Sequence, residues 1–525
     1  MRAQRSHYIR NFLFPCLYLS AITGTVTAFL VFLLKIAAST VISASSNIYE
    51  AVRLNPIWLP ALIIGAALLG LLAAGILSIA PSCVGGGIPT ALSALRGITN
   101  FNWIKSILLL PISALSTFFC GIPLGNEGPC VQMGTAVGMG TVKLFGKKKG
   151  WRRYIMTGGA SAGFSVATGA PITGIIFALE EAHHRFSPML FTIASMSVIF
   201  SQITAKLLSY VFNVPTALFD ISVVHTLSPA DFWAPAVVGL VCGLVSIIFT
   251  LTYKKCDTAV KKTLNKLPVA VKFPLIFATI ALIGFFSAEL LGSGHELTEH
   301  LIAGHGIWYL TIIIFLGRAL LLMISNTAGV TGGIFVPTLA FGAMIGSLCA
   351  EGLISFGLIG AEHRILIITL GMVSFLGASS KIPLTASFFA LETLFGINNM
   401  LTVIIGVTVA FLVIETSRID DFGSTVIKAK AEKRQRGKSS HTVEVALTAR
   451  QDSFVVGKER SDILWPANCV LLTHHKEQSK RTSSVISVGD IFLLHYVTYD
   501  PVATADELEA LVGIQNEETR KIMTE

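Results

Sequence analysis

The feature that most constrains this chain is a series of apolar runs that approach or reach the length of a membrane span. They cover residues 18–34, 60–80, 107–119, 234–251, 274–291 and 307–324. A hydrocarbon core about 30 Å thick is crossed by roughly 20 helical residues. The composition agrees, since 53% of the residues are hydrophobic and only 13% are charged. We therefore predict an all-α polytopic membrane protein.

Basic residues beside these runs predict the orientation in the bilayer. They gather near the N-terminus, around residues 147–153 and between residues 254 and 272. Lys and Arg are enriched in cytosolic segments, and the apolar stretch after residue 10 lacks a small-residue cleavage site. We expect an integral, multi-pass protein of the cell or inner membrane with both termini cytosolic. No nucleic-acid partner is expected, because the cations flank apolar spans and do not form one soluble basic module.

Glycines interrupt several of the apolar runs, and one interruption contains an acid. Residues 125–129 are Gly-Asn-Glu-Gly-Pro, which places Glu127 in the middle of a long apolar region. A charged side chain at membrane depth costs roughly 2.5–3.5 kcal/mol on insertion scales, so such an acid is a functional-site hypothesis. Non-helical backbone is tolerated there where it lines a cavity. The loop therefore predicts a helix that begins inside the membrane.

The second half of the chain repeats features of the first. The glycines and prolines at 125, 129, 134 and 138 recur at 333, 337, 342 and 346, which is a constant offset of 208. Residues 171–180 are matched by residues 383–392 at an offset of 212, and residues 85–87 are matched more weakly by residues 292–294. Three collinear matches predict an internal duplication over about 50–215 and 230–415.

Duplicated membrane halves commonly form inverted repeats whose broken helices meet near the midplane. Glycine followed by proline predicts helix N-termini in the loops at 85–89, 125–129 and 332–337, because glycine permits close approach and proline suits the first turn. The first amides of a helix have no intrahelical partner, and the helix dipole is positive there. The loops therefore predict an anion site made of backbone amides.

These loops, in this order and with the repeat, resemble the CLC family of chloride channels and chloride/proton antiporters over about residues 10–430. The resemblance implies an inverted repeat of broken and tilted helices, assembled as a homodimer with one pore in each subunit. It also implies that Glu127 is the gating glutamate, whose carboxylate occupies an anion site and leaves on protonation. The implied anion-binding residues are Gly86, Gly87, Asn126, Gly128, Ile334, Phe335 and Phe422.

Glu181 follows the repeated segment that ends at Glu180. By resemblance it is the internal proton-transfer glutamate that distinguishes the family's antiporters from its channels. The alternative is an interfacial acid that pairs with Arg185, because Glu180 has a counterpart in the second half, Glu392, and Glu181 has none. With both acids present, we interpret the chain as a chloride/proton antiporter gated by Glu127. A passive voltage- or pH-gated chloride channel remains an alternative.

Three positions depart from the family pattern. Gly86 and Phe422 stand where a serine and a tyrosine hydroxyl are usual, and Asn126 replaces a basic residue. A neutral hydrogen bond contributes roughly 0.5–1.5 kcal/mol, so two missing hydroxyls predict central anion binding weaker by about tenfold or more, with looser coupling. Asparagine beside the gate also occurs in the fluoride-exporting branch, which leaves a fluoride/proton antiporter as an alternative. That branch lacks the acid matched by Glu181.

The composition changes after residue 428. We expect a transmembrane domain over residues 1–430, a charged linker over 431–440 and a small cytosolic α+β domain over 441–525. The last of these resembles the TrkA-C module through residues 454–457, 464–471 and 488–490, which implies a regulatory role and a possible small-molecule ligand. A purely structural dimerisation role is the alternative. A ligand-regulated cation channel could carry the same module, but its filter would need carbonyl loops or acids.

No enzyme, cofactor or metal site is predicted. His295, Glu296 and His300 resemble a zinc-protease motif, but the two histidines are five residues apart where one helical face needs four. The eight cysteines include no CxxC pair, so we interpret them as small hydrophobic residues. The expected partners are therefore chloride or another small anion, protons and the lipid bilayer.

Overall fold

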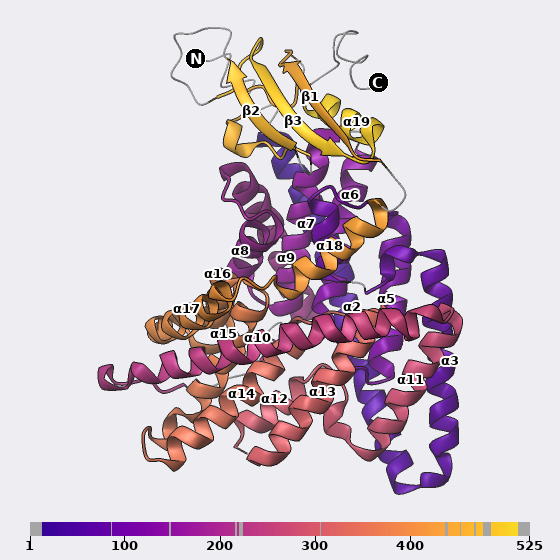
Figure 1. The fold of residues 1–525 in the computed structure, drawn as a ribbon, viewed down its shortest axis with the longest axis vertical. Coiled ribbons are helices and arrows are strands. Elements are labelled where there is room, and N and C mark those ends of the chain that lie inside the picture. The colour runs from indigo at the N-terminus through magenta and orange to yellow at the C-terminus, as the bar shows by residue number, and fades with distance from the viewer. Residues whose placement is uncertain are drawn as a thin grey trace.

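The computed structural model describes residues 13–85, 87–145, 149–215, 218–219, 224–304, 306–435, 439–451, 453–466, 469–475 and 485–512. These residues form a helical body with a small sheet domain over one end, drawn in yellow in Figure 1. Within them, eight helices are long and apolar enough to cross a membrane. The predicted polytopic, all-α membrane fold with a small α+β domain is confirmed.

Two consecutive sets of helices build the body. The first set is α2 (Phe14–Leu54), α3 (Leu59–Ile79), α4 (Ile88–Leu95), α5 (Trp103–Phe119), α6 (Glu127–Leu144), α7 (Arg152–Thr168), α8 (Pro171–Phe177) and α9 (Pro188–Phe212). The second set is α10 (Trp233–Lys262), α11 (Val269–Phe286), α12 (His295–Ile302), α13 (Trp308–Ala328), α14 (Phe335–Ser355), α15 (Arg364–Ser379), α16 (Pro383–Ala390) and α17 (Met400–Thr416). The helices of the two sets follow one another in a similar order of long and short helices.

The repeated glycines lie where helices cross closely. A Cβ atom on Gly134 of α6 would lie 2.0 Å from the Gly159 carbonyl oxygen of α7, and one on Gly342 of α14 would lie 2.5 Å from the Gly371 carbonyl oxygen of α15. Small residues let membrane helices pack backbone against backbone. The same helix pair is therefore built twice, which explains why these glycines recur in the sequence.

A reciprocal pair of backbone hydrogen bonds joins the two sets at Gly125 and Gly333. The Gly125 N–H donates to the Gly333 carbonyl and the Gly333 N–H donates to the Gly125 carbonyl, both at 2.7 Å. These glycines are equivalent residues of the repeat, and their exchange is an antiparallel bridge. Equivalent segments that pair antiparallel are related by a local two-fold axis, which is the relation that the predicted inverted repeat requires.

A second exchange joins α8 to α16. The Glu180 carboxylate accepts hydrogen bonds from the backbone N–H groups of Leu384 and Thr385 and from the Thr385 hydroxyl, at 2.6–2.9 Å. The Glu392 carboxylate makes the three equivalent bonds to the first turn of α8, at 2.5–2.7 Å. Each acid therefore caps a helix of the other set, where the dipole favours negative charge. This is why Glu180, and not Glu181, is repeated.

The C-terminal domain follows α18 (Phe422–Gln435). Its strands β1 (His441–Thr448), β2 (Cys469–His475) and β3 (Ile491–Thr498) form an antiparallel sheet in the order β1-β3-β2, followed by α19 (Pro501–Val512). Alternate residues of β1 and β3 are buried, which is the period expected of a sheet with one face on a core. Figure 1 shows the sheet next to the ends of α6 and α7.

This domain is attached to the helical body by specific contacts. The Tyr154 hydroxyl of α7 donates to the Asp462 carbonyl at 2.5 Å and accepts from the Leu464 N–H at 2.8 Å. The Phe454 ring packs against Trp151 and Tyr154, with each pair of ring centroids 5.5 Å apart. One hydrophobic cluster includes buried residues of both parts. The domain is therefore docked on the body.

Asp462 also caps a membrane helix. Its carboxylate accepts hydrogen bonds from the Ser187 hydroxyl at 2.5 Å and from the Met189 N–H at 3.1 Å, in the first turn of α9. The Arg185 guanidinium donates to the Ile463 carbonyl at 3.0 Å. The C-terminal domain thus holds residues 183–189, the segment that follows Glu181 directly.

Replacing either repeated acid should destabilise the body. Glu180→Gln and Glu392→Gln each leave one oxygen where the carboxylate had two, so we expect a loss of about 1–3 kcal/mol for each. Thermal unfolding in detergent measures this loss. Glu50→Gln, which changes an exposed acid of α2, is the control and should leave Tm unchanged. Equal Tm values in all three variants would contradict the cross-capping role.

Removing the cap at Asp462 should loosen the segment that it holds. We expect Asp462→Ala to speed amide hydrogen exchange in residues 183–190 by about fivefold or more, because a lost N-cap costs about 1 kcal/mol or more. The exchange of α14, far from this contact in sequence, should stay the same. Glu509→Ala, at an exposed acid of α19, serves as the control. Unaltered exchange in Asp462→Ala would show that the cap does not order this segment.

Candidate anion-transport site

Three glycine loops meet where α4, α6 and α14 begin. A Cβ atom on Gly128 would lie 2.8 Å from the Cα atoms of both Gly87 and Gly333. The three backbones therefore touch with no side chain between them. Gly85 adopts φ 63° just before α4, a conformation that glycine takes without strain. The predicted N-termini are observed at Ile88, Glu127 and Phe335, and the contacts bring them to one place.

Glu127 is the first residue of α6 and its side chain lies at this meeting point. The residue is 1% exposed, and within the described residues its Oε2 atom has no hydrogen-bond partner. A Cβ atom on Gly125 would lie 2.4 Å from this oxygen. The same Cβ atom would lie 3.3 Å from Pro337 Cδ in the first turn of α14, and the backbone amides of Glu127 and Val336 are near enough to act on the carboxylate electrostatically. It therefore lies between the N-termini of α6 and α14, where an anion is favoured.

The other predicted site residues have more limited contacts. Asn126 is the N-cap residue of α6 and makes no side-chain cap bond. Ile334 is the N-cap residue of α14, and the Phe335 ring packs edge-on against Phe164 and Phe389, with centroids 5.1 and 5.4 Å apart. Gly86 and the side chain of Phe422 lie outside the described residues.

Two residues at the site were not predicted. Lys35 of α2 acts electrostatically on Glu127, and its ammonium lies 3.5 Å from the Val166 carbonyl oxygen. Gln132 of α6 accepts from the Gly87 N–H at 3.1 Å and donates to the Ser82 carbonyl at 3.0 Å. In this conformation the Gly87 amide is therefore engaged by a side chain. In the sequence, the signals that could have pointed to these two residues were a single lysine and a single glutamine inside apolar helices.

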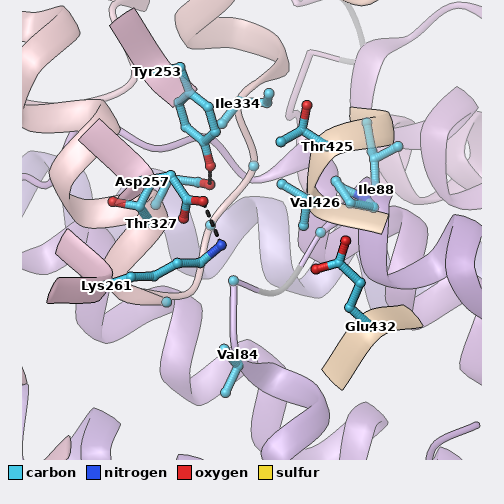
Figure 2. Close-up of a pocket in the computed structure, with 17 residues that line it drawn as sticks. Val84, Ile88, Tyr253, Asp257, Lys261, Thr327, Ile334, Thr425, Val426 and Glu432 are labelled. Atoms are coloured by element: carbon cyan, nitrogen blue, oxygen red, sulfur yellow. Dashed lines mark hydrogen bonds and ion pairs between the residues drawn. The ribbon is translucent and has the colours of Figure 1, made fainter. Parts of the chain in front are cut away.

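A pocket of about 450 Å³ reaches the glycine loops from the side of α18. Figure 2 shows Tyr253, Asp257 and Lys261 of α10 facing Thr425, Val426 and Glu432 of α18 across it. The backbones of Gly85, Gly87, Gly332 and Gly333 line its inner end. Glu127 is not among the lining residues. The buried carboxylate therefore lies outside this pocket.

Glu181 lies in a second pocket, of about 290 Å³. The charged or titratable residues that share it are Arg96, His184, Lys381, Glu415 and Asp421. Arg96 donates to the carbonyls of Glu181 and Ala182 at 2.7 and 3.1 Å, so it holds the backbone. Arg185, the alternative partner, donates to Ile463. Among the described residues the Glu181 carboxylate has no hydrogen-bond partner.

His184 borders the same pocket in the loop between α8 and α9. Its Nε2 atom lies 2.9 Å from an Arg96 Nη atom. Burial, and next the neighbouring Arg96 charge, lower the pKa of His184. The imidazole is therefore neutral near pH 7 and accepts the hydrogen bond from Arg96. A carboxylate without a partner and several polar groups are thus present together where a proton could enter.

The histidines near α12 make ordinary contacts. His295 hydrogen-bonds the Leu218 carbonyl at 2.5 Å and stacks on Phe219. In the part of the chain that the structure describes, no group of three or more His, Cys, Asp or Glu side chains could hold a metal ion.

The comparison with protein families identifies the chain. The family described as voltage gated chloride channel matches residues 65–415, which is about two thirds of the chain. This protein therefore belongs to the CLC family of chloride channels and transporters, and the resemblance carried by the glycine loops is confirmed. A relative is the H(+)/Cl(-) exchange transporter ClcA of Yersinia pseudotuberculosis serotype IB (strain PB1/+), which is 28% identical over 357 residues, 66% of this chain and 73% of ClcA.

Solved structures share the fold. A slow cyanobacterial Cl-/H+ antiporter matches with a TM-score of 0.73 and 22% identity, over 80% of this chain and 99% of the other. A CLC-type fluoride/proton antiporter matches with a TM-score of 0.64 and 19% identity, over 77% and 96%. A eukaryotic CLC transporter matches with a TM-score of 0.63 and 16% identity, over 85% and 78%. At these identities the likeness concerns the fold.

A side chain at the meeting point of the loops should not be tolerated. Gly128→Ala places a Cβ atom 2.8 Å from two backbone atoms, so we expect it to lower stability by about 1–3 kcal/mol through overpacking. Gly75→Ala is the matched control, because a Cβ atom there meets nothing within 4 Å. Thermal unfolding and gel filtration compare the two. If Gly128→Ala is as stable as the wild type, the loops do not touch as described.

Proposed function

We propose that this protein exchanges chloride for protons across a membrane, with Glu127 as the gate and Glu181 as the internal proton-transfer residue. The observation that carries the proposal is the position of the Glu127 carboxylate, buried over Gly125 between the N-termini of α6 and α14. The relative named as an H(+)/Cl(-) exchange transporter supports chloride and protons as the two substrates.

Exchange follows from competition for the same amides. The ionised Glu127 carboxylate is an anion held by helix N-termini, so chloride and the carboxylate exclude each other there. Protonation removes the negative charge and most of this attraction. The neutral side chain then leaves, and chloride takes its place. Each passage of chloride is in this way linked to binding and release of a proton.

A proton must also travel between Glu127 and Glu181. Phe335 at the glycine loops contacts Phe164, and Phe164 stacks on Phe177 of α8 with centroids 4.8 Å apart. Four residues after Phe177 the chain reaches Glu181. These rings hold no proton carrier, so water or movement of a carboxylate has to bridge them. This requirement predicts slow proton transfer relative to chloride movement.

Topology and assembly complete the proposal. We place both termini and the C-terminal domain in the cytosol, in line with the basic segments beside the spans. Apolar side chains remain about half exposed on α8 and α16, at Ile172 (49%) and Leu384 (44%), which supports a homodimer through this face. The TrkA-C-like sequence pattern makes the C-terminal domain a candidate for binding a small-molecule regulator.

Proteoliposomes test the proposed exchange. A chloride gradient should drive protons uphill through the wild type, and Glu127→Gln and Glu181→Gln should each lower proton flux at least tenfold while chloride still moves. The reason is that each variant removes one titrating group from the proton route. Glu50→Gln is the control and should exchange as the wild type does.

Two results would decide against this proposal. Chloride flux without proton flux in the wild type, under any gradient, would establish a passive channel. Proton-coupled movement of fluoride with no chloride movement would establish the fluoride exchanger instead.

A further inference from the structure

A polar pair lies in the 450 Å³ pocket outside the glycine loops. Tyr253 of α10 is 2% exposed, and its hydroxyl donates to the Asn326 Oδ1 atom in the last turn of α13 at 3.1 Å. Both residues line the pocket together with Gly333 and Ile334. Figure 2 shows the Tyr253 hydroxyl directed into the pocket, where a dashed line marks this bond. The pair therefore lies beside the route to the helix N-termini.

The position of Asn326 is fixed relative to the loop that begins α14. The Asn326 carbonyl accepts from the Gly329 N–H at 3.0 Å, and Gly329 turns the chain with φ 93°. Two residues later, the Thr331 hydroxyl donates to the Cys83 carbonyl at 2.9 Å, which ties this loop to the segment before α4. The carboxamide is therefore held near two of the three converging loops.

Asn326 keeps a hydrogen-bond donor for a ligand. Its carboxamide has two N–H groups, and the Tyr253 hydroxyl can engage at most one of them, whichever way the amide is turned. Tyr253 is the one hydrogen-bond partner of this side chain among the described residues. At least one N–H therefore remains for a group inside the pocket.

The charges of the pocket favour a neutral donor as the anion contact. Among the lining residues that the structure describes, Lys261 is the one cation, and it is paired with Asp257 at 2.6 Å. Glu432 adds a negative charge at the exposed end of the pocket. An anion that enters here meets no unpaired cation among these side chains, so the Asn326 amide is the side-chain donor best placed to replace its water.

We propose that the Asn326 carboxamide, oriented by Tyr253, contacts the transported anion on its way to the glycine loops and favours strongly hydrated halides over weakly hydrated anions. This inference rests on the proposed anion transport. Asn326 would also supply the pathway with a side-chain donor. Gly86 and Phe422 lack the hydroxyl groups that are usual in the family at their positions. A neutral amide binds an anion weakly enough to release it, and a transported ion must be released after it binds.

The test measures exchange by full-length variants in proteoliposomes. In Asn326→Leu the KM for chloride should rise by 3- to 10-fold, while the KM for thiocyanate, which is weakly hydrated, should change less than 2-fold. Asn326→Asp keeps the shape and adds a negative charge, so it should raise the chloride KM further. Tyr253→Phe keeps the ring and frees the amide, and should give an intermediate rise. The proton-to-chloride ratio should stay at the wild-type value in each variant.

Thr327→Val is the matched control. Thr327 is the next residue and lines the same pocket, but its hydroxyl donates to the Met323 carbonyl at 2.7 Å, so its chloride KM should match the wild type. Unchanged chloride KM values in both Asn326→Leu and Asn326→Asp would overturn this inference while leaving exchange itself intact. Equal losses for chloride and thiocyanate would overturn the selectivity role. Failure of the wild type to move any anion would instead refute the proposed function.

Discussion

The reciprocal hydrogen bonds between Gly125 and Gly333 are the interaction on which the rest of the structure depends. They join equivalent residues of two oppositely directed halves at 2.7 Å, so the two halves share one point deep in the helical body. Because α6 and α14 begin within two residues of this bridge, their positive ends must face the same small volume. The reciprocal caps at Glu180 and Glu392 fix the same relation at α8 and α16. The symmetry thus brings together the helix N-termini that the proposed anion site needs.

The position of Glu127 in that volume connects structure to transport. A carboxylate without a partner for one oxygen is costly to bury, and here the cost is offset by helix N-termini that suit any anion of similar size. In the proposed mechanism the protein therefore holds its own carboxylate where its substrate would bind. At the far end of α8, Glu181 lies just before a segment that Asp462 and Ile463 of the C-terminal domain hold in place. The docked domain thus contacts the same loop that carries the proposed proton entrance.

The amino-acid sequence predicted much of this arrangement, because its signals were local. Glycine and proline at fixed spacing predicted the starts of α4, α6 and α14, and the offset of 208 contributed to the prediction of an internal duplication. The contacts that the sequence did not predict join residues that only the fold brings together. Gln132 is an ordinary polar residue in sequence, and only the fold brings it to the Gly87 amide. Likewise, no spacing rule links Asp462 to the first turn of α9, 273 residues before it.

The central claim is that the Glu127 carboxylate and the transported anion occupy the same place. Bromide scatters anomalously and stands in for chloride, so crystals of the wild type and of Glu127→Gln soaked in bromide compare the two directly. The account predicts an anomalous peak in Glu127→Gln at the position that the Glu127 carboxylate occupies in the wild type, and no peak there in the wild type. Bromide absent from that position in the variant, or bound beside the intact carboxylate in the wild type, would contradict it.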